Sequence, residues 1–319
     1  MSSINHRINT QYVIRNCDQI TKELLGDNIN KLDWDMISSA RHALSESFIR
    51  RFADRVNWHL ISIHQILSEL FIREFADVVD WDCVSYNQKL SELFIREFID
   101  KIKWENISIC QKLSEPFIRE FADKVNWHFI SIHQKLQASF IREFADRVNW
   151  DDIVRFHKIP ESLIREFADR VNWEYVSECQ ILSESFIEEY SNRVHWQCIS
   201  IRQKLSEDFI SKYINKINMR AILENQTLSE NFIRELATTF NYKRGDRNSN
   251  RCWDIICTNQ KLSESFIREF TDKVRWNAIA VCQSLSEPFI REFAHKMEWD
   301  DIIEYQQMSD SFIKNFASK

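Results

Sequence analysis

Apolar positions recur along this chain in a unit of 23 residues, represented by the segment LSESFIRRFADRVNWHLISIHQI at 44–66. Apolar residues at 48, 49, 52, 53 and 56 fall on one side of a helical wheel, and residues 58, 61, 62 and 65 fall on one side of a second helix. The pattern therefore predicts two short helices per unit, of roughly ten and eight residues, joined by a tight turn at Asn57.

The tryptophans mark the repeat. They occupy one column, at 34, 58, 81, 104, 127, 150, 173, 196, 253, 276 and 299, and Met219 fills the same column. Units start at 20, 44, 67, 90, 113, 136, 159, 182, 205, 228, 262 and 285, and a half unit follows at 308–319. Isolated helices shorter than ~12 residues are marginal because nucleation is costly, so stacked neighbours must stabilise them. We predict an all-α fold, an α-solenoid of about twelve two-helix repeats.

Serines mark the start of the first helix in most units. Each is followed by acidic residues in the first turn, as expected for helix N-caps. These serines are Ser45, Ser68, Ser91, Ser114, Ser183, Ser206, Ser229, Ser263 and Ser286. We predict an N-terminal cap at 1–19 and a single helical-repeat solenoid at 20–319, with an inserted basic loop at about 242–252.

Composition narrows the functional classes. A net charge of -6, from 42 basic and 48 acidic side chains, gives no global positive field and argues against nucleic acid as a partner. No apolar run approaches the roughly 20 residues that span a bilayer, and the start of the chain lacks an apolar signal segment. Eight cysteines without a C-x-x-C pair indicate reduced thiols. We expect a soluble cytoplasmic protein with no membrane partner.

The sequence motif of the repeat is distinctive. The phrase L-S-E-x-F-I-R-E-F-x-D-K-V-x-W-x-x-I-S-x-x-Q-K, nearly intact at 90–112 and 113–135, resembles the short tandem-repeat proteins encoded by giant DNA viruses of amoebae. The resemblance covers nearly all the chain from residue 20 onward. It implies a viral protein acting inside the host cell, and it supplies neither an activity nor catalytic residues.

Two polar columns could be mistaken for ligand sites. Most first helices carry an arginine followed by a glutamate, and we expect i,i+4 pairs such as Arg96 with Asp100 and Glu97 with Lys101 on a solvated face. A phosphate-binding arginine stripe is the alternative. The glutamine column, including Gln65 and Gln88, lies on the apolar face of the second helix, where a buried amide must find partners in a neighbouring turn or its stacked equivalent.

No catalytic or cofactor site is predicted. His59 with His64 and His128 with His133 are five residues apart, which places their side chains on poorly matched helix faces, and no cysteine or carboxylate cluster completes a metal site. Two glycines in the whole chain exclude a Gly-rich phosphate loop. We therefore expect no enzyme activity, no cofactor and no metal.

Variation among the repeats points to the binding residues. Repeats that share packing residues differ at the other positions of the second helix, which suggests a fixed frame presenting variable contacts. The candidate contacts are Leu60, His64, Phe129, His133, Asp152, Arg155, Phe156, Tyr175, Glu178 and Tyr305. Neutral drift at exposed sites is the alternative interpretation.

The insertion between 241 and 252, NYKRGDRNSNRC, is the other irregular feature. It carries Lys243, Arg244, Arg247 and Arg251 against Asp246, so it could dock an acidic partner or a phosphate. A tolerated surface insertion is the alternative.

These features favour a non-enzymatic protein-binding scaffold that acts on a host or viral protein. The alternative is a modular single-stranded nucleic-acid binder in which each repeat reads one base. The acidic total charge weighs against that alternative.

Overall fold

The computed structural model describes residues 9–239 and 247–316, and every regular element in those ranges is a helix. The helices come in repeating pairs, which confirms the predicted all-α solenoid fold. The chain divides into two compact units, 1–163 and 164–319, and the boundary falls within α14 (Glu161–Glu166).

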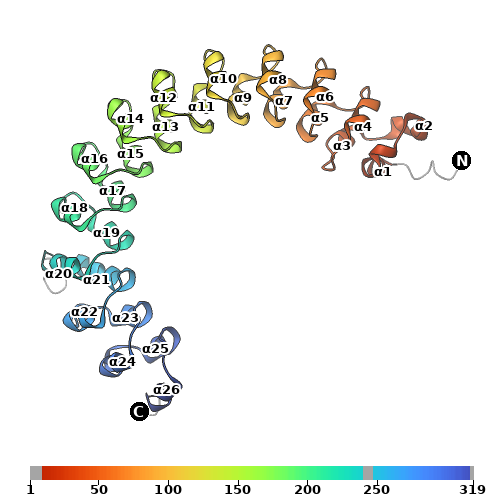
Figure 1. Ribbon diagram of the computed structural model, residues 1–319. Helices are drawn as coiled ribbons and strands as arrows, with labels where there is room; N and C mark the ends of the chain where they lie inside the picture. The colour runs from red at the N-terminus through yellow and green to blue at the C-terminus, as the bar shows by residue number, and fades with distance from the viewer. Residues whose placement is uncertain (1–8, 240–246, 317–319) are drawn as a thin grey trace. The chain divides into compact units, whose positions relative to one another are not determined.

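In the first unit, first and second helices form two rows (Figure 1). The first helices are α4 (Glu46–Arg51), α6 (Glu69–Glu74), α8 (Glu92–Glu97), α10 (Glu115–Glu120) and α12 (Ala138–Glu143). The second helices are α3 (Trp34–Ser38), α5 (Trp58–His64), α7 (Trp81–Asn87), α9 (Trp104–Cys110), α11 (Trp127–His133) and α13 (Trp150–Phe156).

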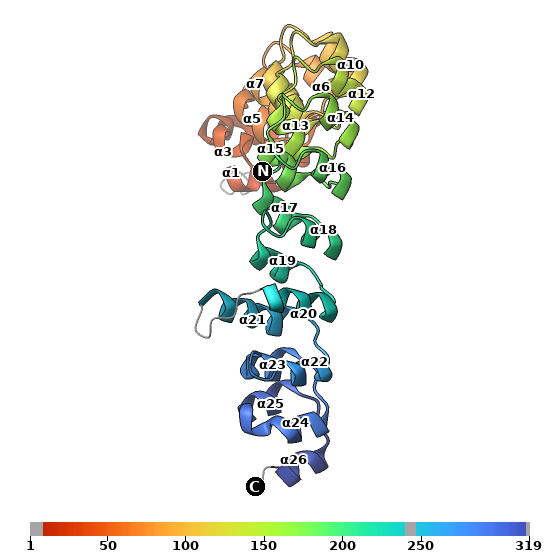
Figure 2. The same ribbon diagram turned by 90° about the vertical axis from the view of Figure 1, so that its left-hand side faces the viewer.

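The second unit repeats this arrangement, as Figure 2 shows from another side. Its first helices are α16 (Glu184–Glu189), α18 (Glu207–Lys212), α20 (Glu230–Thr239), α22 (Glu264–Glu269), α24 (Glu287–Phe293) and α26 (Asp310–Phe316). Its second helices are α15 (Trp173–Cys179), α17 (Trp196–Arg202), α19 (Met219–Asn225), α21 (Arg247–Asn259), α23 (Trp276–Cys282) and α25 (Trp299–Tyr305). A short 3-10 helix, η3 (Ala294–Lys296), follows α24.

The N-terminal residues continue the stack of the first unit. They form α1 (Thr10–Arg15), η1 (Cys17–Gln19), α2 (Lys22–Leu25) and η2 (Gly26–Lys31). Helix α1 packs against α3, and η1 packs against α4. Val13 and Ile20 are fully buried, so this segment covers the apolar end of the first complete repeat.

The helices are shorter than the sequence pattern predicts. A typical first helix has six residues and a typical second helix has seven. In α8 the helix ends because Phe98 adopts φ -112° and ψ 32°, outside the α region. Irregular turns then carry the chain to the second helix, although Ile102 in that turn is buried as its apolar character predicts.

Local hydrogen bonds fix the start of each first helix. The Ser114 hydroxyl accepts a hydrogen bond from the backbone N–H of Phe117 at 3.3 Å, and Pro116 lies in the first turn, where the helix needs no N–H donor. The same serine cap is present in the repeats that begin near 45, 68, 91, 183, 206, 229, 263 and 286. The predicted N-caps are therefore confirmed.

The core follows the predicted apolar positions. In the repeat that contains α10 and α11, Phe117, Ile118 and Ile130 are fully buried. Trp127 is half-buried, and its ring centroid lies 4.8 Å from that of Phe144 in the next repeat. Each repeat therefore completes its core with side chains of its neighbour, as a solenoid requires.

Within each unit, successive second helices lie in close backbone contact, whereas successive first helices are farther apart. This difference gives each unit a local curvature with the second helices on the inner side. Among the described residues, no helix combines the length and the apolar character needed to cross a bilayer.

Candidate functional site

A buried glutamine ladder ties the repeats together. Gln111 is 6% exposed, and its Oε1 accepts a hydrogen bond from the Leu90 N–H at 3.0 Å. Its Nε2 donates to the carbonyls of Ser85 at 3.2 Å and Gln88 at 2.7 Å. Equivalent networks surround Gln65, Gln88, Gln134, Gln203, Gln260 and Gln283. The column satisfies backbone groups between repeats, which confirms its predicted structural role.

A buried serine reinforces each junction. The Ser108 hydroxyl donates to the carbonyl of Trp104 at 2.7 Å and accepts from the N–H of Asn126, in the following repeat, at 3.0 Å. This hydroxyl is fully buried and uses both its donor and its acceptor capacity. Ser108 and Gln111 are thus buried and engaged, whereas Gln226 and Gln306 of the glutamine column are half-buried.

The arginine column pairs mainly across repeats. Arg96, Arg234 and Arg268 also lie 3.7 to 3.9 Å from the glutamate four residues earlier in the same helix. Arg96 Nη2 lies 2.8 Å from Glu120 Oε2, and its Cζ lies 4.8 Å from the ring centroid of Phe117. The same pairing joins Arg50 with Glu74, Arg73 with Glu97, Arg119 with Glu143, Arg165 with Glu189, Arg234 with Glu269, and Arg268 with Glu292.

The predicted i,i+4 partners were therefore wrong. Helix α8 ends at Glu97, so Asp100 and Lys101 lie in the following turn and lack helical i,i+4 geometry. Lys101 instead contacts Asp77 Oδ1 of the preceding repeat at 2.8 Å. The arginine face is a charge-neutralised seam between repeats, which leaves these guanidinium groups engaged and weakens the phosphate-binding alternative.

We expect this seam to make stability fall in acid. Hydrogen bonds from Arg50, Arg73 and Arg119 lower the pKa values of Glu74, Glu97 and Glu143. A carboxyl group whose folded pKa is lowered stabilises the fold above its unfolded pKa, and this contribution is lost as pH falls below about 4.3. Urea unfolding between pH 7 and pH 3 measures the loss.

A matched variant isolates the seam in that measurement. Arg73→Gln should unfold at lower urea concentration than the parent at pH 7, and the gap should narrow as the pH falls through the lowered folded pKa of Glu97, where its carboxyl group takes up a proton. A gap that stays constant with pH would show that the pairing of Arg73 with Glu97 does not stabilise the fold.

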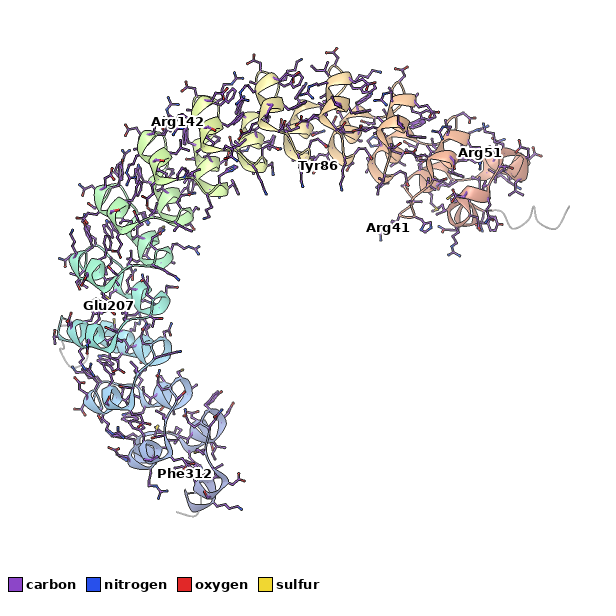
Figure 3. All side chains as sticks on the ribbon, in the orientation of Figure 1. Arg41, Arg51, Tyr86, Arg142, Glu207 and Phe312 are labelled. Atoms are coloured by element: carbon purple, nitrogen blue, oxygen red, sulfur yellow. The ribbon has the colours of Figure 1, made fainter. Side chains whose placement is uncertain are left out.

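The second helices present the variable surface. Figure 3 shows Tyr86 projecting from the row of second helices, while Arg142 lies on the row of first helices. Among the predicted binding residues, most are accessible on the second helices. Exposed are His64, His133, Arg155, Phe156, Glu178 and Tyr305, and half-buried are Leu60, Phe129 and Tyr175.

Asp152 is the exception among the candidate contacts. It is 6% exposed, and its Oδ2 lies 2.7 Å from His128 Nδ1 of the preceding repeat. The prediction of Asp152 as an accessible contact was wrong, because α13 packs against α11 and covers this position. The neighbouring rings of Phe129 and His133 lie 6.3 Å apart and stay accessible.

An apolar strip runs along the second helices of the first unit. We define the second-helix strip as Leu60, Ile63, Tyr86, Ile109, Phe129, Ile132 and Phe156. Tyr86 and Phe156 are each 54% exposed, and the other members are half-buried. These residues lie on successive helices that contact one another, so the strip follows the row of second helices. Sequence reasoning named three of its members, Leu60, Phe129 and Phe156.

The second unit differs at the equivalent positions. Glu178 Oε1 lies 3.7 Å from Arg202 Nη2, and Arg220 Nε lies 2.7 Å from Glu224 Oε1. Glu178 and Glu224 thus occupy the position that holds Ile63, Tyr86, Ile109 and Ile132 in the first unit. At the same position of the second unit, Ile201 and Val281 are apolar and exposed.

Residues 247–252 of the insertion are helical. Helix α20 extends to Thr239, and α21 begins at Arg247, six residues before Trp253. The predicted loop at about 242–252 was therefore wrong for residues 247–252. Arg251 is exposed, whereas Lys243 and Arg244 and the side chain of Arg247 lie outside the described residues.

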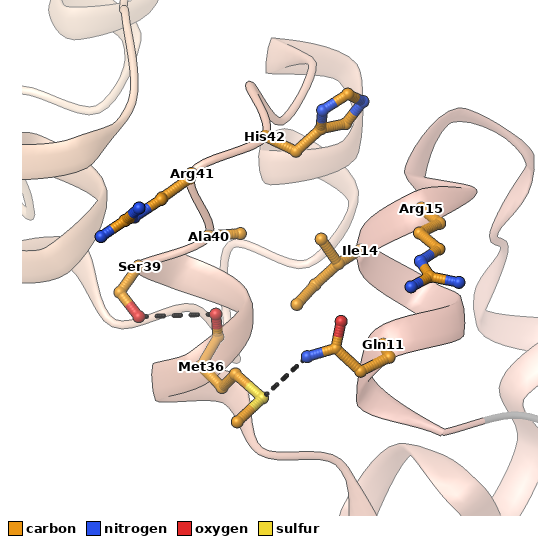
Figure 4. A pocket seen from close by; sticks show the side chains of 8 residues that line it. All are labelled: Gln11, Ile14, Arg15, Met36, Ser39, Ala40, Arg41 and His42. Atoms are coloured by element: carbon orange, nitrogen blue, oxygen red, sulfur yellow. Dashed lines mark hydrogen bonds between the residues drawn. The ribbon is translucent and has the colours of Figure 1, made fainter.

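An open hollow lies between α1 and α3, with Arg15, Arg41 and His42 at its edge (Figure 4). Gln11 Nε2 lies 3.6 Å from Met36 Sδ across it. All five side chains are exposed, so the hollow lacks the buried polar group that would fix a ligand.

One cluster of potential metal ligands lies between α5 and α7. His59 Nδ1 lies 2.7 Å from Asp80 Oδ2 and 3.6 Å from Cys83 Sγ. Burial and the Asp80 carboxylate raise the pKa of Cys83 to about 11, so the thiol is protonated at neutral pH. Sequence reasoning missed this group because it searched within single helices, whereas these residues come from adjacent repeats.

Comparisons of the whole chain with protein-family models, curated proteins and solved structures find no match.

Proposed function

We propose that this chain is a non-enzymatic scaffold that binds a protein partner on the second-helix strip. The supporting observation is the contrast between constant and variable positions. The glutamine, serine and arginine columns are consumed in joining repeats, while Tyr86 and Phe156 stay exposed although both are large aromatic side chains. Exposed aromatic residues on a rigid frame are typical anchors of protein interfaces.

The charges beside the strip suggest the chemistry of the partner. Asp82, Glu105 and Asp151 occupy the exposed position after tryptophan in three repeats of the first unit, and His59 and His128 hold it in two others. An apolar strip with an acidic edge suits an amphipathic segment that carries apolar anchors and flanking basic residues. A host or viral protein with such a segment is the proposed partner, in keeping with the resemblance of the repeat motif to viral tandem-repeat proteins.

The proposal includes a reducing compartment such as the cytoplasm, because all eight cysteines are free thiols. Single-stranded nucleic acid is the second candidate. The arginines that would contact phosphates are held by glutamates of the next repeat, which favours the protein scaffold.

The test uses affinity capture from host-cell lysate with the full chain and two double variants. Tyr86→Asp with Phe156→Asp places charges on the strip and should reduce the recovery of a specific partner at least about tenfold, in line with the loss of interface anchors. The control, Leu70→Asp with Leu93→Asp, changes side chains that are 75% and 76% exposed but lie on first helices, and should retain the partner.

Nuclease treatment separates the two candidate functions. Partner recovery that survives nuclease and is lost only in the strip variant supports the scaffold. Recovery that disappears with nuclease, or equal loss in both double variants, contradicts binding of a protein on the second-helix strip.

A further inference from the structure

Three positions converge at the junctions between repeats. The first position is the residue directly after the tryptophan of one repeat. The other two belong to the next repeat, where they are the residue directly before its tryptophan and the second residue after it. The first two positions are joined by Asn57 Nδ2 and Asp35 Oδ1 at 2.8 Å in one junction, and by Asn218 Nδ2 and Gln197 Oε1 at 2.6 Å in another. We call this set of three positions the junction triad. The repeat fold brings these three positions together, so the chemistry of a junction triad depends on which residue types occupy them.

At the junction of α5 and α7, the triad consists of His59, Asp80 and Cys83. The ligand atoms of all three lie within 4.8 Å of one another. An imidazole nitrogen, a carboxylate oxygen and a sulfur are donors that zinc accepts together. Asp80 and Cys83 are half-buried and His59 is exposed, so the cluster is open to solvent on one side.

The distance between the imidazole nitrogen and the sulfur fits a tetrahedral ion. With Zn–N near 2.0 to 2.1 Å and Zn–S near 2.3 Å, tetrahedral angles place nitrogen and sulfur about 3.6 Å apart. His59 Nδ1 and Cys83 Sγ are 3.6 Å apart. His59 Nδ1 and Asp80 Oδ2 are 2.7 Å apart, a hydrogen-bond distance that must open by roughly 0.7 Å to admit the ion.

The carboxylate is oriented by the backbone. Asp80 Oδ1 accepts hydrogen bonds from the N–H groups of Asp82 at 3.0 Å and Cys83 at 3.1 Å. This leaves Oδ2 directed at His59. Such outer contacts hold metal ligands in place in known sites.

We propose that His59, Asp80 and Cys83 bind a zinc ion through Nδ1, Oδ2 and Sγ, with water as the fourth ligand. Binding requires the thiolate of Cys83 and an unprotonated Nδ1 on His59. The displaced protons pass to solvent, and the affinity rises with pH. The ion joins α5 to α7 and so fastens one repeat to the next beside the second-helix strip.

A second junction carries the same donor types in a different order. There the triad is Glu174, His195 and Cys198, with His195 Nδ1 3.2 Å from Cys198 Sγ. Among the described residues, the group of His59, Asp80 and Cys83 brings all three ligand atoms together. The site is therefore assigned to the first junction, and Cys198 must be removed from the test.

The experiment titrates the full chain carrying Cys198→Ala with Co²⁺ as the probe. A sulfur-to-cobalt charge-transfer band should develop at one molar equivalent, and Zn²⁺ should abolish it by displacement. Adding Cys83→Ala should remove the band and weaken Co²⁺ binding by at least about a hundredfold, more than the loss of an outer contact. The matched control, Cys110→Ala, changes an exposed thiol on α9 and should leave the titration unchanged.

Asp80→Asn supplies a variant that keeps the helix cap, since asparagine is an equally good N-cap residue. It should fold as the parent and bind Co²⁺ more weakly. A melting temperature raised by Zn²⁺ in the Cys198→Ala protein, and unchanged by Zn²⁺ after Cys83→Ala, is the second expected readout. Absence of the band in the Cys198→Ala protein, or equal titrations for Cys83→Ala and Cys110→Ala, overturns the assignment.

Discussion

Phe94→Ala should destabilise the first unit by about 3 to 5 kcal/mol, the range for truncating a buried aromatic side chain. Phe94 is 1% exposed, and its ring centroid lies 4.7 Å from that of Phe98 and 6.2 Å from that of Trp81 in the adjacent second helix. Truncation removes contacts on both sides of a repeat junction. Urea unfolding followed by tryptophan fluorescence measures the change.

The neighbouring residue provides the control. Leu93 is also a large apolar residue in α8, but it is 76% exposed. Leu93→Ala should change the unfolding free energy by no more than about 0.5 kcal/mol, as for surface substitutions generally. If both variants unfold alike, the assignment of α8 residues to core and surface is wrong.

Gln111→Ala should lower the free energy of unfolding by about 2 to 5 kcal/mol, because it leaves the Leu90 N–H and the Gln88 carbonyl without their partner in a buried junction. The size of the effect depends on how far water can enter the space. Lys112→Ala, at the exposed neighbouring position, should have almost no effect. Equilibrium unfolding of the three proteins at pH 7 makes the comparison.

Gln111→Glu tests the polarity of this network. The new carboxyl group keeps an acceptor for the Leu90 N–H but, when ionised, cannot donate to the carbonyls of Ser85 and Gln88. Burial raises the pKa of such a group, so the variant should gain stability relative to the parent as pH falls from 7 towards 5. A constant difference across that range would indicate that the ladder is hydrated.

The repeat itself was predictable in detail. The serine caps, the buried Phe and Ile of the first helix and the buried glutamine column each follow from local spacing, because a 3.6-residue period and N-cap chemistry act within a few residues. Repetition strengthened the prediction, because a position that has diverged in one repeat can be assigned from the same position in the other repeats. The helix lengths were less predictable, because Ile102 and its equivalents are buried from a turn and mimic the pattern of a longer helix.

The partners of the charged residues were not predictable from spacing within one helix. Arg96 has candidate acidic partners along its own chain segment, yet the structure pairs it with Glu120, 24 residues later. Stacking brings these side chains together, and the guanidinium then also lies over Phe117. A single helix contains no information about which residue its neighbour will present.

The repeat, its helical character and its core follow from the sequence alone, because they depend on apolar spacing and on caps within each repeat. Which polar residues meet depends on how the repeats stack. Stacking pairs Arg96 with Glu120, buries Asp152 beside His128, places isoleucines of separate repeats along one row of second helices, and brings His59, Asp80 and Cys83 together. Each of these contacts crosses a repeat junction, where the register between stacked helices sets the distance.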